Sequence, residues 1–177
     1  MRYDWVAWTE IETERLLLRP PEAADFEGFC ELHGDERSAK FIGGLKSRPL
    51  SWRALATHIG HWHIRGFGMF SILEKSTGDW IGRAGPWFPE GWLQPEVGWG
   101  LVPRSWGKGY ATEAGLALVD HAFEELGWDE VVHLIDSMNA ASIAVAERIG
   151  SVNTGRTHEL TDYGVTVGVW GQQRLQA

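Results

Sequence analysis

The sequence contains a single cysteine, Cys30, among its 177 residues. One cysteine cannot form an internal disulfide, and no neighbouring cysteine is available to complete a zinc site with it. Long hydrophobic runs are also missing, because no apolar stretch approaches the roughly 20 residues that a transmembrane helix needs. The N-terminus lacks a basic region followed by a continuous apolar segment. We therefore expect a cytoplasmic protein that does not act at a membrane.

Positive charge is scarce as well. Lys and Arg together number 16 against 24 Asp and Glu, which gives a formal net charge of -8 at pH 7. Binding to a phosphate backbone needs clustered Lys and Arg, so we expect no nucleic-acid partner. An acidic surface tolerates a cationic partner, and the net charge therefore favours cationic binding partners in general.

The remaining composition is typical of one globular domain. Hydrophobic residues make up 44% and charged residues 23% of the chain, without an internal repeat, a low-complexity tract or an obvious linker. We expect a single domain over residues 1–177. The eleven tryptophans are unusual, and they could form a core, a stacking surface or an interface, including that of a homodimer.

The hydrophobic pattern changes period along the chain, which predicts a mixture of strands and helices. Residues 95–103, for example, alternate apolar and other side chains like a strand with two distinct faces. Strands outnumber helices, so the expected class is α/β (α+β), with helices packed on a curved, mainly antiparallel mixed sheet. The expected helices cover residues 22–33, 51–65, 111–126 and 140–149, and the expected strands lie in residues 13–20, 69–85, 95–103, 130–136 and 151–170.

Residues 102–115, VPRSWGKGYATEAG, place two glycines and a lysine where a strand turns into a helix. The first turn of a helix presents backbone N–H groups without intrahelical acceptors, and the macrodipole adds partial positive charge there. Gly107 and Gly109 have no Cβ, so a phosphate could approach the backbone, while Arg104 and Lys108 could add charge. The alternative is a plain glycine turn between a strand and a helix.

Residues 104–109, RSWGKG, resemble the Gln/Arg-x-x-Gly-x-Gly/Ala pyrophosphate loop of the GNAT acetyltransferase superfamily. Three blocks, TERLLLRP, EVGWGLVPRSWGKGYATEA and NAASIAVAERIG, resemble in that order the ribosomal-protein N-terminal acetyltransferase (Rim-type) branch. Together they span residues 13 to about 156. The resemblance implies the GNAT fold, with helices on both sides of the sheet, and acetyl-CoA as the cosubstrate.

The same resemblance implies which residues bind acetyl-CoA. The glycine loop would hold the pyrophosphate through backbone amides, and the preceding strand would pair with the pantetheine arm. Asn139 would contact the same arm, and the side chain of Tyr110 would pack at the helix start. The residues expected to bind acetyl-CoA are Trp99, Gly100, Leu101, Val102, Arg104, Trp106, Gly107, Lys108, Gly109, Tyr110, Ala111 and Asn139.

Acetyl transfer to an amine requires a proton acceptor, an oxyanion donor and a proton for the leaving thiolate. Glu96 is the candidate base, acting directly or through a water, although it could be a solvated strand carboxylate. Backbone N–H groups near Trp99 would serve the oxyanion. Ser142 occupies the position of the serine in the Rim-type pattern and would hydrogen-bond to the thiolate, or it could be a first-turn residue bonded to Asn139.

We therefore expect an N-acetyltransferase that moves an acetyl group from acetyl-CoA to a primary amine by direct transfer in a ternary complex. The acceptor could be a peptide, such as a protein N-terminus, or a small molecule. Cys30 lies far from the acetyl-CoA blocks, which argues against a covalent acetyl-cysteine, and the histidines of HIGHWH lack the partners of a metal site. The alternative function is that of a non-catalytic acetyl-CoA-binding sensor. The tryptophans that could line the acceptor pocket, or belong to the core, are Trp52, Trp62, Trp87 and Trp92.

Overall fold

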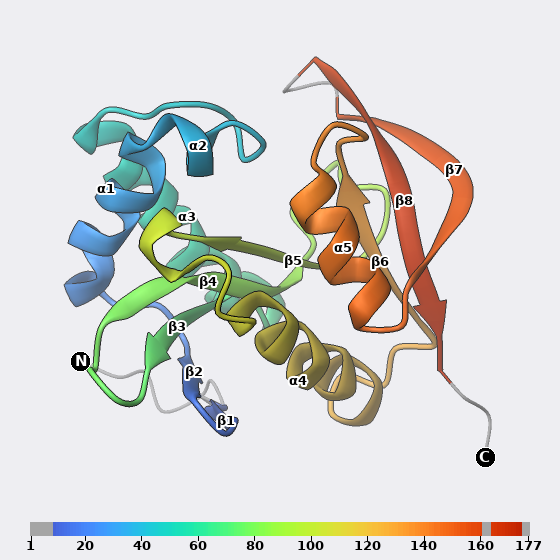
Figure 1. The fold of residues 1–177 in the computed structure, drawn as a ribbon, viewed down its shortest axis with the longest axis horizontal. Coiled ribbons are helices and arrows are strands. Elements are labelled where there is room, and N and C mark those ends of the chain that lie inside the picture. Colours follow the sequence, from blue (N-terminus) through green and yellow to red (C-terminus); the bar gives the residue numbers. More distant parts are fainter. Residues whose placement is uncertain (1–8, 161–163, 175–177) are drawn as a thin grey trace.

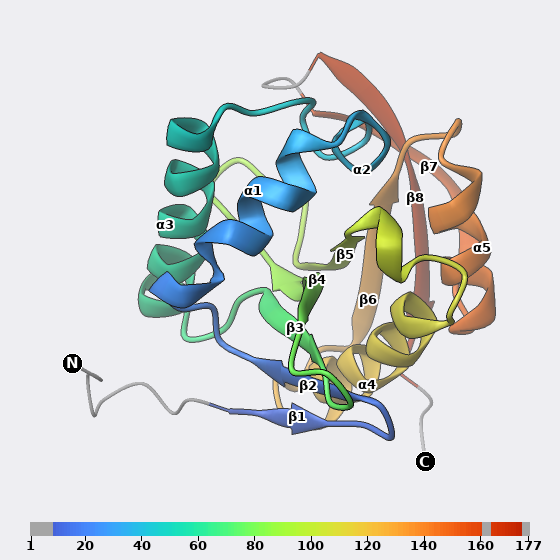
Figure 2. The same ribbon diagram turned by 60° about the vertical axis from the view of Figure 1, so that its left-hand side comes forward.

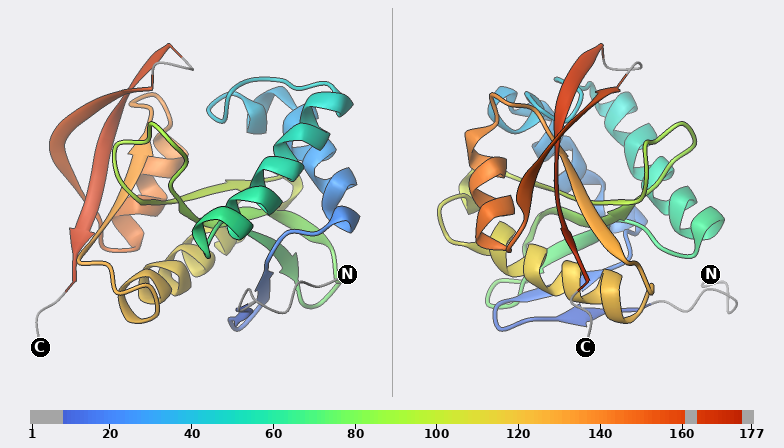
Figure 3. Two further views of the ribbon diagram at one scale, coloured as in Figure 1. Left: turned by 180° about the vertical axis from the view of Figure 1, so that it is seen from behind. Right: turned by 90° about the vertical axis from the view of Figure 1, so that its right-hand side faces the viewer.

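The structure is a computed structural model, and it describes residues 9–160 and 164–174. Within these ranges one mixed sheet carries helices on both faces (Figures 1 and 3). The strands are β1 (Ile11–Glu12), β2 (Leu16–Arg19), β3 (Phe70–Glu74), β4 (Trp80–Trp87), β5 (Glu96–Leu101), β6 (Glu130–Ile135), β7 (Val152–Leu160) and β8 (Val165–Gln173). The helices are η1 (Ala23–Asp25), α1 (Phe26–Gly34), α2 (Glu36–Ala39), α3 (Arg48–Arg65), η2 (Pro103–Ser105), α4 (Tyr110–Glu124) and α5 (Ala140–Arg148).

The strands lie in the order β1-β2-β3-β4-β5-β6-β8-β7. Neighbouring strands are antiparallel except for β5 and β6, which run parallel and pair only through Glu96 and Val132. Beyond that single pair β5 and β6 separate, although β5 stays paired with β4 along its whole length. The expected curved, mainly antiparallel mixed sheet is confirmed, and its parallel pair separates beside Glu96.

The helices divide between the two faces of the sheet. Figure 1 shows α4 and α5 in front of it, and from behind, in Figure 3, α3 crosses in front of the strands. Helices α1, α2 and α3 gather around β4, whereas α5 lies beside β6, β7 and β8 (Figures 1 and 2). The break between β5 and β6 therefore lies between these two groups of helices.

The helix ends follow the glycines of the sequence. Helix α3 ends at Gly66 (φ 76°), and α4 begins after Gly109 (φ 83°), where a left-handed backbone favours glycine. Helix α3 begins at Arg48, earlier than expected, because Pro49 fits the first turn of a helix. No helix of the described residues is long and apolar enough to cross a membrane.

The first expected helix is divided into η1 and α1. Asp25 causes the interruption, because its buried carboxylate binds elements outside the helix. It forms an ion pair with Arg19 over 2.6 Å and accepts a hydrogen bond from the hydroxyl of Ser71 over 2.7 Å. These contacts anchor the start of α1 to the neighbouring strands β2 and β3.

Helix α4 supplies the side of the core that positions the glycine loop. Its residues Ala114, Leu118 and Ala122, spaced four apart, are fully buried, as their helical spacing predicts. They join the apolar side chains of β2 to β5 in one hydrophobic cluster. The packing fixes the N-terminus of α4 next to the end of β5, and both line one cavity.

Candidate active site

Two cavities flank the place where β5 and β6 separate. The first, which we call the glycine-loop cavity, has a volume of about 850 Å³ and is lined by the residues after β5 and by the first turns of α4 and α5. The second, the Glu96 cavity, has a volume of about 620 Å³ and is lined by β4, β5, β6 and the N-terminal helices. Residues that line both cavities are Lys40, Phe41, Ile42, Trp99, Asn139 and Ser142.

The glycine-loop cavity contains the N-terminus of α4. Gly109 is the N-cap of this helix and offers no side chain to bond the amides of the first turn. Gly107 and Gly109 both have left-handed backbones, with φ 74° and 83°, and a Cβ built at Gly107 would meet no atom within 4 Å. The loop therefore presents first-turn amides to open space, which suits an anion.

A polar bridge holds the glycine loop against the start of the chain. Arg15 donates to the carbonyl oxygen of Lys108 over 2.8 Å and forms an ion pair with Glu113 over 2.7 Å. Glu113 also accepts hydrogen bonds from the hydroxyl of Thr13 and from the backbone N–H of Arg15. These contacts direct the Glu113 carboxylate to β2 and keep its charge away from the cavity.

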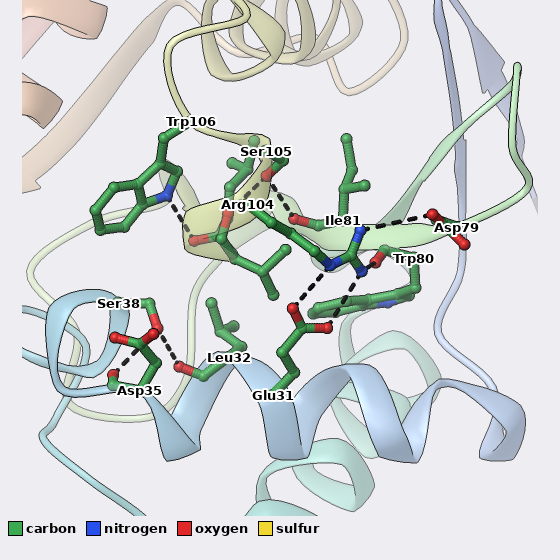
Figure 4. A network of polar contacts seen from close by, with 12 residues as sticks. Glu31, Leu32, Asp35, Ser38, Asp79, Trp80, Ile81, Arg104, Ser105 and Trp106 are labelled. Carbon is green, nitrogen blue, oxygen red and sulfur yellow. Dashed lines mark hydrogen bonds and ion pairs between the residues drawn. The ribbon is translucent and has the colours of Figure 1, made fainter.

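Arg104 does not point into the glycine-loop cavity. Its guanidinium binds Glu31 of α1 over 2.8 Å and donates to the carbonyl oxygen of Trp80 over 2.8 Å (Figure 4). The indole of Trp106 lies on the other side of η2 and donates to the carbonyl oxygen of Leu101. The prediction that the Arg104 side chain adds charge to the loop does not agree with this arrangement, because local acids already bind the guanidinium.

The other expected acetyl-CoA residues divide into two groups. The structure brings Trp99, Gly100, Leu101, Trp106, Gly107, Gly109, Tyr110, Ala111 and Asn139 together along the cavity. Val102, Lys108 and Arg104 lie outside its lining, and the Tyr110 hydroxyl donates to Glu74, so its phenol turns to β3. Sequence reasoning missed the basic side chains Arg37 and Arg148, which also line the cavity and come from separate helices.

Glu96 is buried, with 6% of its surface exposed, and lies in the lining of the Glu96 cavity. Its carboxylate accepts hydrogen bonds from the indole of Trp92 and from the backbone N–H of Leu134, each over 2.9 Å. Burial raises the pKa of Glu96 to about 7, against the opposing effect of these hydrogen bonds and of the Arg83 charge. A carboxylate with this pKa can exchange protons near neutral pH.

Ser142 lies where the two cavities meet. Its hydroxyl oxygen accepts a hydrogen bond from the indole of Trp99 over 3.3 Å, and its backbone N–H donates to the side chain of Asn139 over 3.1 Å. Asn139 is thus the N-cap of α5. The expected bond to Asn139 is present and uses only the backbone of Ser142, and the Ser142 side chain lies in the lining of both cavities. The bond to a thiolate stays a prediction.

The four tryptophans considered for an acceptor pocket have different environments. Trp87 and Trp92 line the Glu96 cavity. Trp62 is 2% exposed and belongs to the core, whereas Trp52 is 59% exposed on α3. Trp99 of β5 lies beside His133, with ring centroids 4.9 Å apart, and lines both cavities.

Comparison with known proteins identifies the same architecture. Residues 15–152 match the family model described as Acetyltransferase (GNAT) domain. The fold is similar to the crystal structure of an acetyltransferase from Agrobacterium tumefaciens str. C58, with a TM-score of 0.82, 32% identity, and coverage of 98% of this chain and 99% of that one.

Two Bacillus proteins are similar in sequence over most of their length. "Uncharacterized protein YkkB" of Bacillus subtilis (strain 168) is 33% identical over 152 residues, which are 81% of this chain and 86% of that protein. "Uncharacterized N-acetyltransferase p20" of Bacillus licheniformis is 29% identical over 156 residues, 86% of each chain. With a family match over most of its residues and a shared fold, the chain belongs to the GNAT acetyltransferase family.

Proposed function

We propose that this protein transfers an acetyl group from acetyl-CoA to a primary amine, directly and within a ternary complex. The observation that carries the proposal is the meeting of two cavities at Ser142. One cavity contains the exposed amides of a helix N-terminus, and the other contains a buried carboxylate with a pKa of about 7. An anionic cosubstrate and a basic acceptor therefore each have a suitable environment.

The glycine-loop cavity fits acetyl-CoA, which supplies the activated thioester when bound. The amides after Gly107 and Gly109 would bind its pyrophosphate, and the open space at Gly107 leaves room for that group. Arg148 would add the positive charge that Arg104 does not provide, whereas the guanidinium of Arg37 is already paired with Asp35 over 2.6 Å. The edge of β5 beyond Glu96, unpaired with β6 in the described ranges, would bind the pantetheine arm.

Glu96 would act as the general base. A protonated amine cannot attack a thioester, so the acceptor must lose a proton before or during transfer. The buried carboxylate would accept that proton, directly or through a water, and its pKa of about 7 lets it do so near neutral pH. The neighbouring Trp92 and Leu134 N–H groups orient the carboxylate.

Ser142 would stabilise the leaving thiolate by a hydrogen bond. Because the Trp99 indole can only donate, the serine oxygen accepts in that contact and its own proton stays available for the sulfur. Backbone N–H groups of β5 near Trp99 would stabilise the carbonyl oxygen. Cys30 lies in α1 and lines neither cavity, which supports direct transfer over an acetyl-cysteine route.

Placement within the Rim-type branch is also a proposal, and its basis is the order of the three sequence blocks. That branch does not determine the acceptor, because residues of separate loops and helices line the Glu96 cavity.

Thiol release from acetyl-CoA tests the proposed function. The panel contains N-terminal peptides, amino acids, polyamines and aminoglycosides, and the signal is corrected for the thiol of Cys30. Amine-dependent release with matching acetylated product supports the transferase. Binding of acetyl-CoA without release across the panel would instead favour a non-catalytic sensor.

A further inference from the structure

The wall of the Glu96 cavity contains a second group of polar side chains that the proposed chemistry does not use. His33 comes from α1, Lys46 from the loop before α3, His58 from α3 and Arg83 from β4. We call these four residues the basic cluster. They are separate in sequence: three come from α1, α3 and the loop before α3, and Arg83 comes from β4, whereas Glu96 begins β5.

The basic cluster combines two cations in a partly enclosed space. The ammonium of Lys46 donates to the carbonyl oxygens of Ile42 and Gly44 over 3.1 and 3.3 Å. Among the described residues no carboxylate forms an ion pair with it. Burial and the nearby charge of Arg83 lower the pKa of Lys46, so the two cations are close enough to repel each other. A bound anion would relieve this repulsion.

The two histidines contribute buried polar atoms that have no hydrogen-bond partner among residues 9–160 and 164–174. His33 is 2% exposed and His58 is 6% exposed, and the Nδ1 atom of each lacks a hydrogen bond. The ring of Phe29 packs against both imidazoles, with centroids 5.8 and 5.5 Å away, and fixes their positions. Burial and the Arg83 charge lower the pKa of His33 to about 3, so this imidazole is neutral and can donate from one ring nitrogen.

Buried polar atoms without partners are rare in folded proteins. Here the two that lack partners belong to imidazoles of residues that line the Glu96 cavity. Two cations with two neutral imidazoles match an oxyanion, which accepts several hydrogen bonds and carries negative charge. The electrostatic effect of Arg83 extends to both histidines, to Lys46 and to Glu96. The cluster is therefore close to Glu96, the carboxylate that would accept the proton of the acceptor amine.

We propose that the basic cluster binds an oxyanion group of the acceptor, a carboxylate or a phosphonate, so that the acceptor is a small amino-acid-like molecule. This inference rests on the proposed function of the same cavity. The amine would lie at Glu96 and the oxyanion at Lys46 and Arg83. The net charge of -8 favours a cationic acceptor, but charges farther apart than about 8 Å are largely screened at physiological salt, so the local cluster decides.

Matched acceptors test the proposal. Phenylalanine, phenylalaninamide and phenethylamine share a ring and a primary amine, but only the first carries a carboxylate, and 1-amino-2-phenylethylphosphonate replaces that carboxylate with a phosphonate. We expect the two acids to have a kcat/KM at least about 10-fold above the two amines that lack an acidic group, which lose one or two charge-assisted hydrogen bonds. Equal or faster turnover of the amines that lack an acidic group would overturn the proposal and leave the transferase intact.

Two other outcomes separate this inference from the proposed function. Faster turnover of N-terminal peptides than of any amino acid would overturn the small-molecule acceptor. If no amine is acetylated, the transferase fails, and binding of N-acetylphenylalanine against N-acetylphenylalaninamide, followed by tryptophan fluorescence, still tests the oxyanion site. Preferred binding of the acid supports the cluster, and equal binding of the two contradicts it.

Variants of the cluster give a sharper readout. Lys46→Gln should raise the KM of phenylalanine about 10-fold and leave that of phenethylamine unchanged, while Lys46→Arg should restore much of the preference. Arg53→Gln is the matched control, because Arg53 is exposed on α3 and lines neither cavity. A parallel rise in KM for both acceptors would show a merely structural role for Lys46.

A second variant remains informative if Lys46 proves necessary for folding. His58→Phe keeps an aromatic ring against Phe29 and removes the buried Nδ1 atom that lacks a partner. We expect the melting temperature to stay the same or rise, while the preference for the carboxylate falls. A lower melting temperature with an unchanged preference would show that His58 has only a packing role.

Discussion

Trp99 donates a hydrogen bond from its indole nitrogen to the hydroxyl oxygen of Ser142 over 3.3 Å, and both residues line both cavities. The bond joins β5 to the first turn of α5 across the gap where β5 and β6 separate. An indole N–H cannot accept, so it fixes the direction of the serine lone pairs and leaves the serine proton free to donate. Among the described residues, Ser142 is the only one with a hydroxyl that lines both cavities, and Trp99 fixes the position of that hydroxyl.

Replacing Ser142 with Ala should lower kcat about 10-fold, the value of one hydrogen bond to a developing thiolate. The KM of acetyl-CoA should change little, because the backbone N–H that Asn139 caps is retained. Steady-state kinetics measure both constants. Ser137→Ala is the control, since Ser137 is exposed in the preceding loop and lines neither cavity. A Ser142→Ala variant with full kcat would restrict Ser142 to a structural role.

Replacing Glu96 with Gln should lower kcat by at least about 100-fold, the usual contribution of a general base. In the wild type the rate should rise with pH through about 7, because the base acts only when it is deprotonated. The variant should lose that ascending limb while it still binds acetyl-CoA in the other cavity. A pH profile of kcat/KM from 5.5 to 9 measures this, and an unchanged limb in the variant would contradict the assignment.

The same pKa predicts a stability effect of Glu96. Its folded-state pKa of about 7 lies above the ordinary value of 4.5, so the folded protein retains the proton more strongly than the unfolded chain. The stabilisation is complete below about pH 4.5 and is lost as pH rises through 7, with a loss of about 3 kcal/mol. The melting temperature of Glu96→Gln relative to the wild type should therefore rise between pH 5 and pH 8. A constant difference would contradict the buried carboxylate.

The structure brings many of the expected site residues together, but it does not place the Arg104 charge with them. The glycines, Asn139 and Ser142 belong to contiguous blocks whose local geometry depends on neighbours in sequence, and the structure places them along one cavity. Arg104 belongs to such a block too, but its guanidinium binds Glu31, which precedes it by 73 positions. Partners this distant depend on how α1 packs beside η2, which local patterns do not encode.

The same limit applies to the buried groups of the Glu96 cavity. The position of Glu96 in an alternating strand made it a candidate base, but its pKa depends on burial by β6 and on Trp92. His33 and His58 lie in different helices, and nothing in their spacing predicts that both face Arg83. Sequence analysis considered His58 only with its neighbours in HIGHWH, so it missed the partner from α1.

Arg104→Gln should leave the KM of acetyl-CoA within about two-fold of the wild type, because the guanidinium binds Glu31 and lies outside the lining of the glycine-loop cavity. The ion pair that is lost is partly exposed and contributes roughly 1 kcal/mol or less to stability. The same change at Arg148, which lines the glycine-loop cavity, should raise that KM by about 3- to 10-fold. The effect at Arg148 should shrink at high salt. A large KM effect at Arg104 with none at Arg148 would restore the role that the sequence predicts for Arg104.

The glycine loop can be tested against a turn with the same backbone. Gly107 has φ 74° and Gly78, in the turn between β3 and β4, has φ 75°, and a Cβ at either position meets no atom within 4 Å. Alanine at each should therefore cost a similar amount of stability, about 1 kcal/mol for a left-handed residue. Only Gly107→Ala should raise the KM of acetyl-CoA, by about 10-fold, because its methyl group would occupy the space where the pyrophosphate approaches the amides. Equal KM values for the two variants, at equal loss of melting temperature, would mean that Gly107 serves the turn alone and that the pyrophosphate binds elsewhere.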